Sequence, residues 1–243
     1  MRSEGLWTVG FQAVLAVLES DQPVDALWLQ QDRRDQRAKR IIAAARRRGI
    51  RWDVVPRARL EHVSEGGVHN GCAVRSAPVD FVELENVIAA DGVPARLVLL
   101  DDIDDPHNLG AVVRTAAALG IDGLIIAGPS APPLGGAVAK AAAGLLGRIP
   151  VSRVKVAGDA LSRLQEYGYW IFGADAAGTA LTDVASTQRW VLCLGAEGTG
   201  LRAKTRSKVD EFVAIPMADG VESLNLSVSA GILLWELSRP VEK

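Results

Sequence analysis

The stretch Leu194-Gly-Ala-Glu-Gly-Thr-Gly-Leu201 closes an apolar run that begins at Trp190. Its three glycines let the backbone come close to a flat ligand and leave N–H groups free to bind it. Open α/β sheets build their ligand sites in the loops at the carboxyl ends of the strands. The stretch therefore predicts a ligand-binding loop that follows a buried strand.

The order of these glycines narrows the choice of ligand. It is Gly-x-x-Gly-x-Gly, whereas the dinucleotide-binding fingerprint is Gly-x-Gly-x-x-Gly followed by an acidic residue about 20 positions later. The chain also lacks a Gly-Lys-Ser/Thr phosphate loop and the Gly-x-Ser-x-Gly elbow of serine hydrolases. A nucleotide-binding oxidoreductase is therefore a distant alternative.

Two further segments have the same character. Asp105-Pro-His-Asn-Leu-Gly-Ala-Val-Val-Arg-Thr-Ala116 comes soon after an apolar run that ends at Asp101. Ile215-Pro-Met-Ala-Asp-Gly-Val-Glu-Ser-Leu-Asn-Leu-Ser227 follows the run that begins at Phe212. Because parallel strands end at a common edge of their sheet, the three segments predict one pocket assembled from three loops, and so an enzyme.

Each segment contains candidates for chemistry. Asn108 stands where the N-cap of a helix over 109–119 is expected. Arg114 is the only charged residue in that helix, so its guanidinium needs an anionic partner or a path to solvent. Glu197 is a candidate to hold a ribose, a base edge or Arg114, and is otherwise a solvated loop acid.

The third segment leads into a helix expected over 226–238. Ser223 and Asn225 precede it and are candidates both for capping the helix and for contacting a substrate. The helix is apolar nearly all round, which predicts that it is buried.

The second part of the chain predicts an α/β fold with a parallel sheet. Its apolar runs are near-continuous, as in strands that are covered on both faces, and helical patterns alternate with them. We expect strands over 97–100, 123–127, 169–172, 190–194 and 212–215, and helices over 109–119, 136–147, 158–167 and 226–238.

The first part predicts a smaller α/β domain of about 75 residues. Its patterns indicate helices over 10–19 and 34–48 and strands over 26–29, 51–55 and 71–75. A stretch with two prolines and four acidic residues follows. We therefore expect a first domain over 1–76, a connector over 77–95 and a second domain over 96–243.

Charge is unevenly spread along the chain. The net charge is −2, but residues 31–59 contain 11 basic and three acidic residues, a local charge of +8. A basic segment of this density can neutralise the phosphates of a nucleic acid. The alternative is a solvated helix face.

Composition excludes several classes of protein. The chain is 49% hydrophobic and 23% charged, so it can bury a substantial core. No run approaches the roughly 18 apolar residues that span a membrane, and the start has no secretory signal, so we expect a cytoplasmic protein. Cys72 and Cys193 lie in apolar runs and are expected to be buried thiols, and the histidines and cysteines show no metal-ligand spacing.

Together, the three segments resemble in order and spacing the motifs of the SPOUT superfamily, and more narrowly of the TrmH (SpoU) family of RNA ribose 2′-O-methyltransferases. Gly10-Phe-Gln-Ala-Val14 and Gly67-Val-His-Asn-Gly71 resemble the small N-terminal substrate-binding domain of that family, which has a ribosomal-protein-like α/β fold. The resemblance covers nearly the whole chain. The layout is most similar to the bacterial enzymes that methylate a guanosine of 23S rRNA.

The resemblance implies a C-terminal domain with a deep trefoil knot, through which residues 226–238 are tucked. It implies S-adenosylmethionine as cofactor, no metal, an RNA substrate and a homodimer without membrane association. The cofactor would be held around Gly195, Gly200, Ile215, Met217 and Leu224, and the catalytic set would be Asn108, Arg114, Glu197, Ser223 and Asn225.

In this scheme Arg114 helps to deprotonate the ribose 2′-hydroxyl or holds the adjacent phosphate, while Glu197 orients Arg114. The side chains of Asn108, Ser223 and Asn225 position the hydroxyl. The group that takes the proton stays open, because an arginine is almost permanently protonated in water.

The chain departs from the family pattern at a few positions. Gln12 stands where a histidine is expected, and Ala142 and Leu145 replace a small polar residue and an alanine. These differences concern the target nucleotide more than the reaction. We expect ribose 2′-O-methylation of a guanosine in 23S rRNA, with the same reaction on tRNA or an inactive RNA-binding protein as alternatives.

Overall fold

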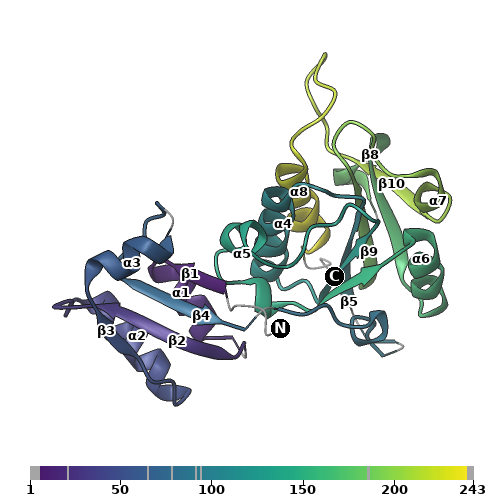
Figure 1. Ribbon diagram of the computed structural model, residues 1–243. Coiled ribbons are helices and arrows are strands. Elements are labelled where there is room, and N and C mark those ends of the chain that lie inside the picture. The colour runs from purple at the N-terminus through teal and green to yellow at the C-terminus, as the bar shows by residue number, and fades with distance from the viewer. Residues whose placement is uncertain are drawn as a thin grey trace. The chain divides into compact units, whose positions relative to one another are not determined.

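The computed structural model describes residues 6–20, 22–64, 66–77, 79–90, 92–93, 95–184 and 187–239. The chain forms two compact units (Figure 1). The first comprises Met1–Asp80 and Leu134–Arg148, and the second comprises Phe81–Pro133 and Ile149–Lys243. Among the helices of the described residues, none is long and apolar enough to cross a membrane.

The first unit is built on a four-stranded sheet in the order β1-β4-β2-β3. Strands β2 and β3 are parallel, and the other pairs are antiparallel. The small α/β fold agrees with the prediction, although strand β1 and helix α3 were not predicted. The elements are β1 (Leu6–Val9), α1 (Phe11–Leu18), β2 (Val24–Gln30), α2 (Gln36–Arg47), β3 (Asp53–Val55), α3 (Arg57–Ser64) and β4 (Cys72–Ser76).

Helices α1 and α2 cover one face of this sheet. Helix α2 begins at Asp35, whose side chain accepts a hydrogen bond from the Ala38 N–H at 2.8 Å. Its buried residues recur at helical spacing, and they pack with α1, β2 and β4 into one core. The opposite face carries α3 and a smaller cluster around Val55, Leu60 and Ala73.

The second unit contains a six-stranded sheet in the order β10-β8-β9-β5-β6-β7. Every neighbouring pair is parallel, which confirms the predicted parallel sheet. The strands are β5 (Ala95–Asp101), β6 (Gly123–Ala127), β7 (Val151–Val154), β8 (Trp170–Ala180), β9 (Arg189–Gly195) and β10 (Glu211–Ala214).

Helices cover both faces of this sheet (Figure 1). Helix α6 (Ala157–Glu166) packs on the face formed by the side chains of alternate strand residues such as Leu99 and Val191. Helices α4 (Pro106–Ala118) and α8 (Leu226–Leu237) pack against each other, and α8 also contacts β9. A short helix, α7 (Ala203–Arg206), follows β9.

The helix expected over 136–147 is much shorter. Helix α5 spans only Ala137–Ala141, and a 3-10 turn follows at Leu146–Arg148. The break falls where Ala143 and Gly144 adopt left-handed φ values of 51° and 84°. A Cβ atom at Gly144 would lie 2.2 Å from the Ala13 carbonyl oxygen, so only glycine allows this approach of the chain to α1.

The stretch after Asp80 packs within the second unit. A 3-10 turn at Leu84–Asn86 leads to the buried side chain of Val87, which joins the core beneath α6. The buried Arg189 side chain donates hydrogen bonds to the carbonyls of Ala89 (2.8 Å) and Ala90 (2.7 Å). Within the range expected to be a connector, Val87, Ala89 and Ala90 are therefore packed against or hydrogen-bonded to the second unit.

Both cysteines are buried free thiols, as predicted. Burial raises the pKa of the Cys72 thiol to about 11. Burial also raises the pKa of Cys193, which lies within β9. At neutral pH both therefore behave as small apolar residues.

Candidate active site

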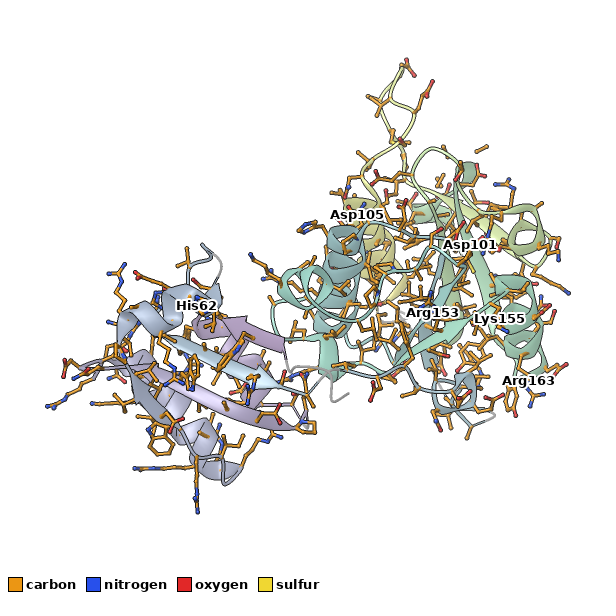
Figure 2. All side chains as sticks on the ribbon, viewed as in Figure 1. His62, Asp101, Asp105, Arg153, Lys155 and Arg163 are labelled. Atoms are coloured by element: carbon orange, nitrogen blue, oxygen red, sulfur yellow. The ribbon has the colours of Figure 1, made fainter. Side chains whose placement is uncertain are left out.

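The first segment enters its helix differently from the prediction. Asp105, not Asn108, caps α4: its side chain accepts a hydrogen bond from the His107 N–H at 2.8 Å. Figure 2 labels Asp105 near the start of this helix. Pro106 occupies the first helical position, where its missing N–H costs nothing. Asn108 consequently lies inside the first turn, and its side chain is free for other contacts.

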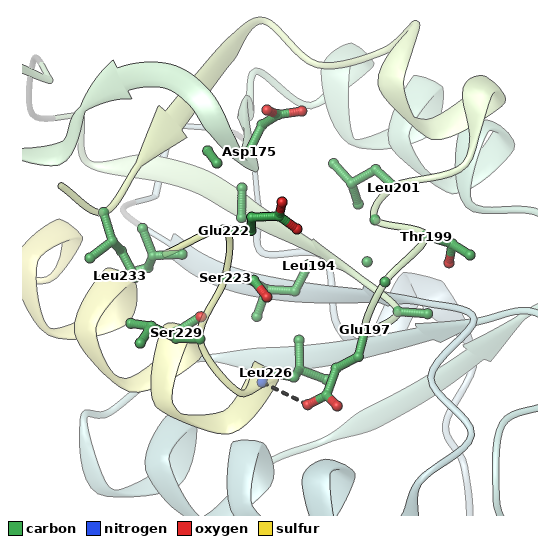
Figure 3. Close-up of a pocket in the computed structure, with 18 of the residues that line it drawn as sticks. Asp175, Leu194, Glu197, Thr199, Leu201, Glu222, Ser223, Leu226, Ser229 and Leu233 are labelled. Atoms are coloured by element: carbon green, nitrogen blue, oxygen red, sulfur yellow. Dashed lines mark hydrogen bonds between the residues drawn. The ribbon is translucent and has the colours of Figure 1, made fainter. Parts of the chain in front are cut away.

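Glu197 joins the three predicted loops. Its Oε1 atom accepts hydrogen bonds from Asn108 Nδ2 (3.1 Å), Asn225 Nδ2 (2.8 Å) and the Leu226 N–H (3.0 Å). Asn225 Nδ2 also donates to Asn108 Oδ1 at 3.0 Å. Figure 3 shows Glu197 directed at the start of α8. Three of the predicted catalytic residues thus form one network across the ends of β5, β9 and β10.

Asn225 is held in one orientation by the helix that it caps. Its Oδ1 atom accepts hydrogen bonds from the Ser227 N–H (3.0 Å), the Ser227 hydroxyl (2.6 Å) and the Val228 N–H (3.4 Å). The amide oxygen therefore faces the helix and the amide nitrogen faces Glu197. The predicted cap is confirmed, and it fixes the group that meets the carboxylate.

A cavity of about 690 Å³ opens beside this network (Figure 3). This volume is typical of sites for small organic molecules. The loops after β9 and β10 and the end of β8 form the walls. The lining includes all five residues predicted to hold the cofactor and three of the predicted catalytic residues: Gly195, Gly200, Ile215, Met217 and Leu224, with Glu197, Ser223 and Asn225.

The glycine loop has a shape that only glycine permits. A Cβ atom at Gly195 would lie 2.1 Å from the carbonyl carbon of Gly200, because the loop folds back on itself. Gly198 and Gly200 have left-handed φ values of 82° and 66°. Apolar walls at Leu194 and Leu233 and polar groups at the rim suit a ligand with a flat ring and charged ends. S-adenosylmethionine fits this description.

Arg114 lies apart from the network. It is exposed on α4 and does not line the cavity. Among the described residues, no carboxylate lies within 4.0 Å of its guanidinium. The expected pairing of Arg114 with Glu197 is not formed in this structure, where Glu197 accepts N–H groups instead.

Asp101 was not singled out from the sequence, yet it anchors the glycine loop. It is fully buried at the end of β5, where it pairs in register with Gly195. Its carboxylate accepts hydrogen bonds from the Arg202 N–H (3.0 Å), Arg202 Nε (2.8 Å) and the Thr205 hydroxyl (2.6 Å). The two ends of the loop are therefore attached to one residue. The sequence did contain one signal for Asp101, which is that this charged residue ends an apolar run.

Asp175 and Arg206 form an ion pair in the cavity wall, with 2.5 Å between Oδ2 and Nη1. Hydrogen bonding from the Ala177 N–H and then from Arg206 lowers the pKa of Asp175 below its ordinary value. These residues were also missed, because β8 was expected to end at residue 172. They are further candidates to meet the polar ends of the cofactor.

The basic segment 31–59 divides into structural and exposed residues. Arg48 donates hydrogen bonds to the carbonyls of Val17 (3.1 Å) and Gln22 (2.9 Å), and Arg33 binds the Asn70 carbonyl. The other nine basic residues are exposed: Arg34, Arg37, Lys39, Arg40, Arg46, Arg47, Arg51, Arg57 and Arg59. Most of the positive charge is thus available to an anionic partner.

Two loops at the carboxyl ends of parallel strands line the cavity, and Asn108, from the segment after β5, is hydrogen-bonded to residues of both. A site of this kind is typical of an α/β enzyme that binds an organic ligand. Comparison of the sequence with models of known families identifies the class of enzyme. Residues 95–235 match the SpoU rRNA Methylase family. Residues 7–82 match the model for RNA 2′-O ribose methyltransferase substrate binding.

Relatives with similar sequences agree with this result. A TrmH family tRNA/rRNA methyltransferase of Staphylococcus haemolyticus is 33% identical over 241 residues, covering 97% of this chain and 96% of the relative. A tRNA/rRNA methyltransferase of Mycobacterium tuberculosis is 37% identical over 235 residues, covering 95% of this chain and 73% of the relative.

Solved structures share the fold. The SpoU methyltransferase AviRb from Streptomyces viridochromogenes, in complex with AdoMet, has a TM-score of 0.77 at 25% identity, over 98% of this chain and 90% of that one. An AdoMet-bound rRNA methyltransferase from Sinorhizobium meliloti has a TM-score of 0.79 at 22% identity, over 99% and 89% of the two chains.

The chain belongs to the SpoU (TrmH) methylase family. It is an RNA methyltransferase with the SPOUT fold, and its cofactor is S-adenosylmethionine. The predicted fold class, family and cofactor are therefore confirmed. The trefoil knot and the roles of the individual site residues stay predictions.

Proposed function

We propose that this enzyme transfers the methyl group of S-adenosylmethionine to a ribose 2′-hydroxyl of RNA, and that its target is a guanosine in 23S rRNA. The observation that carries the proposal is the network of Asn108, Glu197 and Asn225 beside the cofactor-sized cavity. It gathers amide and carboxylate groups from three loops at one point of the cavity rim. Such groups can align a hydroxyl without taking part in bond formation.

For methyl transfer, the main task of the protein is to align the ribose hydroxyl with the methyl group. S-adenosylmethionine supplies a methyl group that its sulfonium already activates. The side chains must hold the ribose hydroxyl in line and reduce the free energy of the alkoxide. Asn108 and Asn225 are the groups that we assign to alignment, with Ser223, which lines the cavity, as a third.

Arg114 is proposed to contact the RNA substrate and not another residue of the protein. Its guanidinium has no carboxylate within 4.0 Å in the described part of the chain, so it is free to meet an RNA phosphate or the 2′-oxygen. As a permanent cation, it would stabilise negative charge on that oxygen. Glu197 has a separate part, which is to hold Asn108 and Asn225 in place.

The first unit is assigned to gripping RNA. The exposed side chains of α2 and the turn before it include Arg34, Arg37, Lys39, Arg40 and Arg47. None of these five has a carboxylate within 4.0 Å among the residues described here. They can neutralise phosphates, and their contribution will weaken as salt rises.

We propose that the enzyme is a homodimer, because one face of α8 is apolar and exposed. Val228, Ile232 and Trp235 are spaced as neighbours on a helix and are 49%, 39% and 63% exposed. The helix was expected to be buried all round, and this face is the part that the described residues of one chain leave exposed. A second copy of α8 would cover it.

The experiment that tests the proposal uses purified full-length protein, methyl-labelled S-adenosylmethionine and unmodified rRNA or tRNA. Label in 23S rRNA at an alkali-resistant guanosine is the expected result. Label in tRNA alone would move the target to tRNA, which the names of several relatives include. Label on a base would overturn the reaction. We propose that the enzyme acts in the cytoplasm.

A further inference from the structure

Two tryptophans of the first unit form the centre of a stack of planar groups. Trp7 of β1 and Trp28 of β2 have ring centroids 4.0 Å apart and planes tilted by 40°. The guanidinium of Arg59 lies 4.3 Å from the Trp28 ring centre, and that of Arg75 lies 5.7 Å from the Trp7 ring centre. We call Arg59, Trp28, Trp7 and Arg75 the Arg–Trp stack.

The stack lies on the sheet face that is only partly covered. Trp7 pairs with Arg75 across β1 and β4, and Trp28 pairs with Ala73 across β2 and β4. Helix α3 has eight residues and covers a small cluster that includes Ala73, whereas α1 and α2 bury the opposite face. The indoles are consequently half-buried and both guanidinium groups are exposed.

Neither arginine of the stack forms a close ion pair with a carboxylate among the described residues. Arg59 has no carboxylate within 4.0 Å among the described residues, and Arg75 approaches only Asp25, at 4.0 Å. Arg57, two residues before Arg59 on the same helix, is instead paired with Glu61 at 2.7 Å. The exposed face of α3 therefore offers one arginine paired with a carboxylate and one whose guanidinium lies over an indole ring.

We propose that an unpaired base of the RNA substrate stacks on the Arg–Trp stack. Bases stack on aromatic rings and on guanidinium planes only when they are not hidden inside a duplex. The positive charge of Arg59 and Arg75 suits the adjoining phosphates. The inference rests on the proposed function, and it adds that the first unit selects single-stranded or looped RNA over a helix.

The test compares two RNA ligands of equal phosphate number: an unstructured oligonucleotide and a blunt duplex. Fluorescence anisotropy measures binding of each to full-length wild type, Arg59→Lys and the matched control Arg57→Lys. Arg59→Lys keeps the charge but loses the plane, so it should weaken binding of the single strand about tenfold and leave the salt dependence unchanged. Arg57→Lys should bind as wild type does.

Equal losses for the single strand and the duplex, or no loss in Arg59→Lys, would overturn the inference. A second measurement needs no variant. Ultraviolet crosslinking of the wild type to the single strand should join RNA to peptides that contain Trp7 or Trp28. Crosslinks confined to α2 peptides would count against the stack.

Failure of the inference can be told apart from failure of the proposed function. Wild type that methylates an RNA ribose while Arg59→Lys binds normally refutes the stack alone. Wild type that neither binds RNA nor methylates it refutes both.

Discussion

Asp101 and Arg202 are 101 residues apart in the chain, and their side chains are joined by a hydrogen bond of 2.8 Å between Arg202 Nε and Asp101 Oδ1. The carboxylate also accepts the Arg202 backbone N–H, so both the side chain and the main chain of Arg202 are held. Because Asp101 is the sheet neighbour of Gly195, this contact closes the glycine loop that forms one wall of the cofactor cavity.

We predict that Arg202→Ala destabilises the protein more than Asp101→Asn does. The first change leaves a fully buried carboxylate without its guanidinium, which costs about 3 kcal/mol. The second leaves an arginine whose side chain is 39% exposed and can be solvated, at about 1–2 kcal/mol. Urea unfolding measures both. Lys204→Ala, an exposed neighbour on α7, is the control.

Both Asp101 and Arg202 variants should also bind S-adenosylmethionine more weakly, because one end of the glycine loop is released. Isothermal titration calorimetry on the folded variants measures this. Unchanged cofactor affinity, with stability reduced, would show that the pair supports the sheet without shaping the loop.

Glu197 should act through its geometry more than through its charge. Glu197→Gln keeps an oxygen that can accept the Leu226 N–H, whereas Glu197→Ala leaves Asn108 and Asn225 without their common acceptor. We expect a small fall in kcat for Gln and a fall of about 100-fold for Ala, since misplaced groups cost that much. Asp219→Asn, in the same exposed loop as Asn225, is the control. Equal losses in the two Glu197 variants would instead make the charge essential.

Arg114→Ala should abolish methyl transfer and leave cofactor binding intact. Arg114 is outside the cavity lining and has no carboxylate within 4.0 Å in the described ranges, so its loss removes nothing that holds the cofactor. Single-turnover transfer and calorimetric titration measure the two effects separately. Arg163→Ala, on α6, controls for the loss of an exposed arginine. Persistent transfer would exclude Arg114 from catalysis.

Asp175 should make stability depend on acid pH. Hydrogen bonds from Ala177 and Arg206 lower the pKa of Asp175 below the ordinary 3.8, so its contribution is present above that pH and is lost as the pH falls below it. Asp175→Asn should reduce the free energy of unfolding by up to about 1 kcal/mol near neutral pH. Urea unfolding from pH 7 to pH 3 should show the difference shrinking at the acid end. Asp104→Asn, an exposed loop residue, should show no such trend.

The sheet of the second unit was largely predictable because its central strands are continuous apolar runs. Strand β7 was not, since Ser152 and Arg153 interrupt its pattern. The break after α5 was also missed, because it follows from the approach of Gly144 to Ala13, and such a contact leaves no local pattern. Helix α8 looked uniformly apolar, and sequence alone could not separate the face that packs inside from the exposed one.

The site could be predicted as far as three loops converging, because the carboxyl ends of parallel strands meet. The network of Asn108, Glu197 and Asn225 follows from that rule. Asp101 and Arg202 could not be paired, since no spacing relates residues on separate strands and loops. The extension of β8 to Ala180, which brings Asp175 to the cavity, lacks an apolar signal because its outer half is small and polar.

The exposed face of α8 gives the last prediction, that Trp235→Asp converts a dimer into a monomer. Trp235 is 63% exposed and shares its helix face with Val228 and Ile232, so a charge there would be buried without a partner at a self-association interface. Light scattering should give wild type twice the chain mass of 25.8 kDa and the variant that mass once. Val54→Asp, 62% exposed on β3, should leave the mass unchanged. A wild type that is monomeric at all concentrations would overturn the proposed dimer.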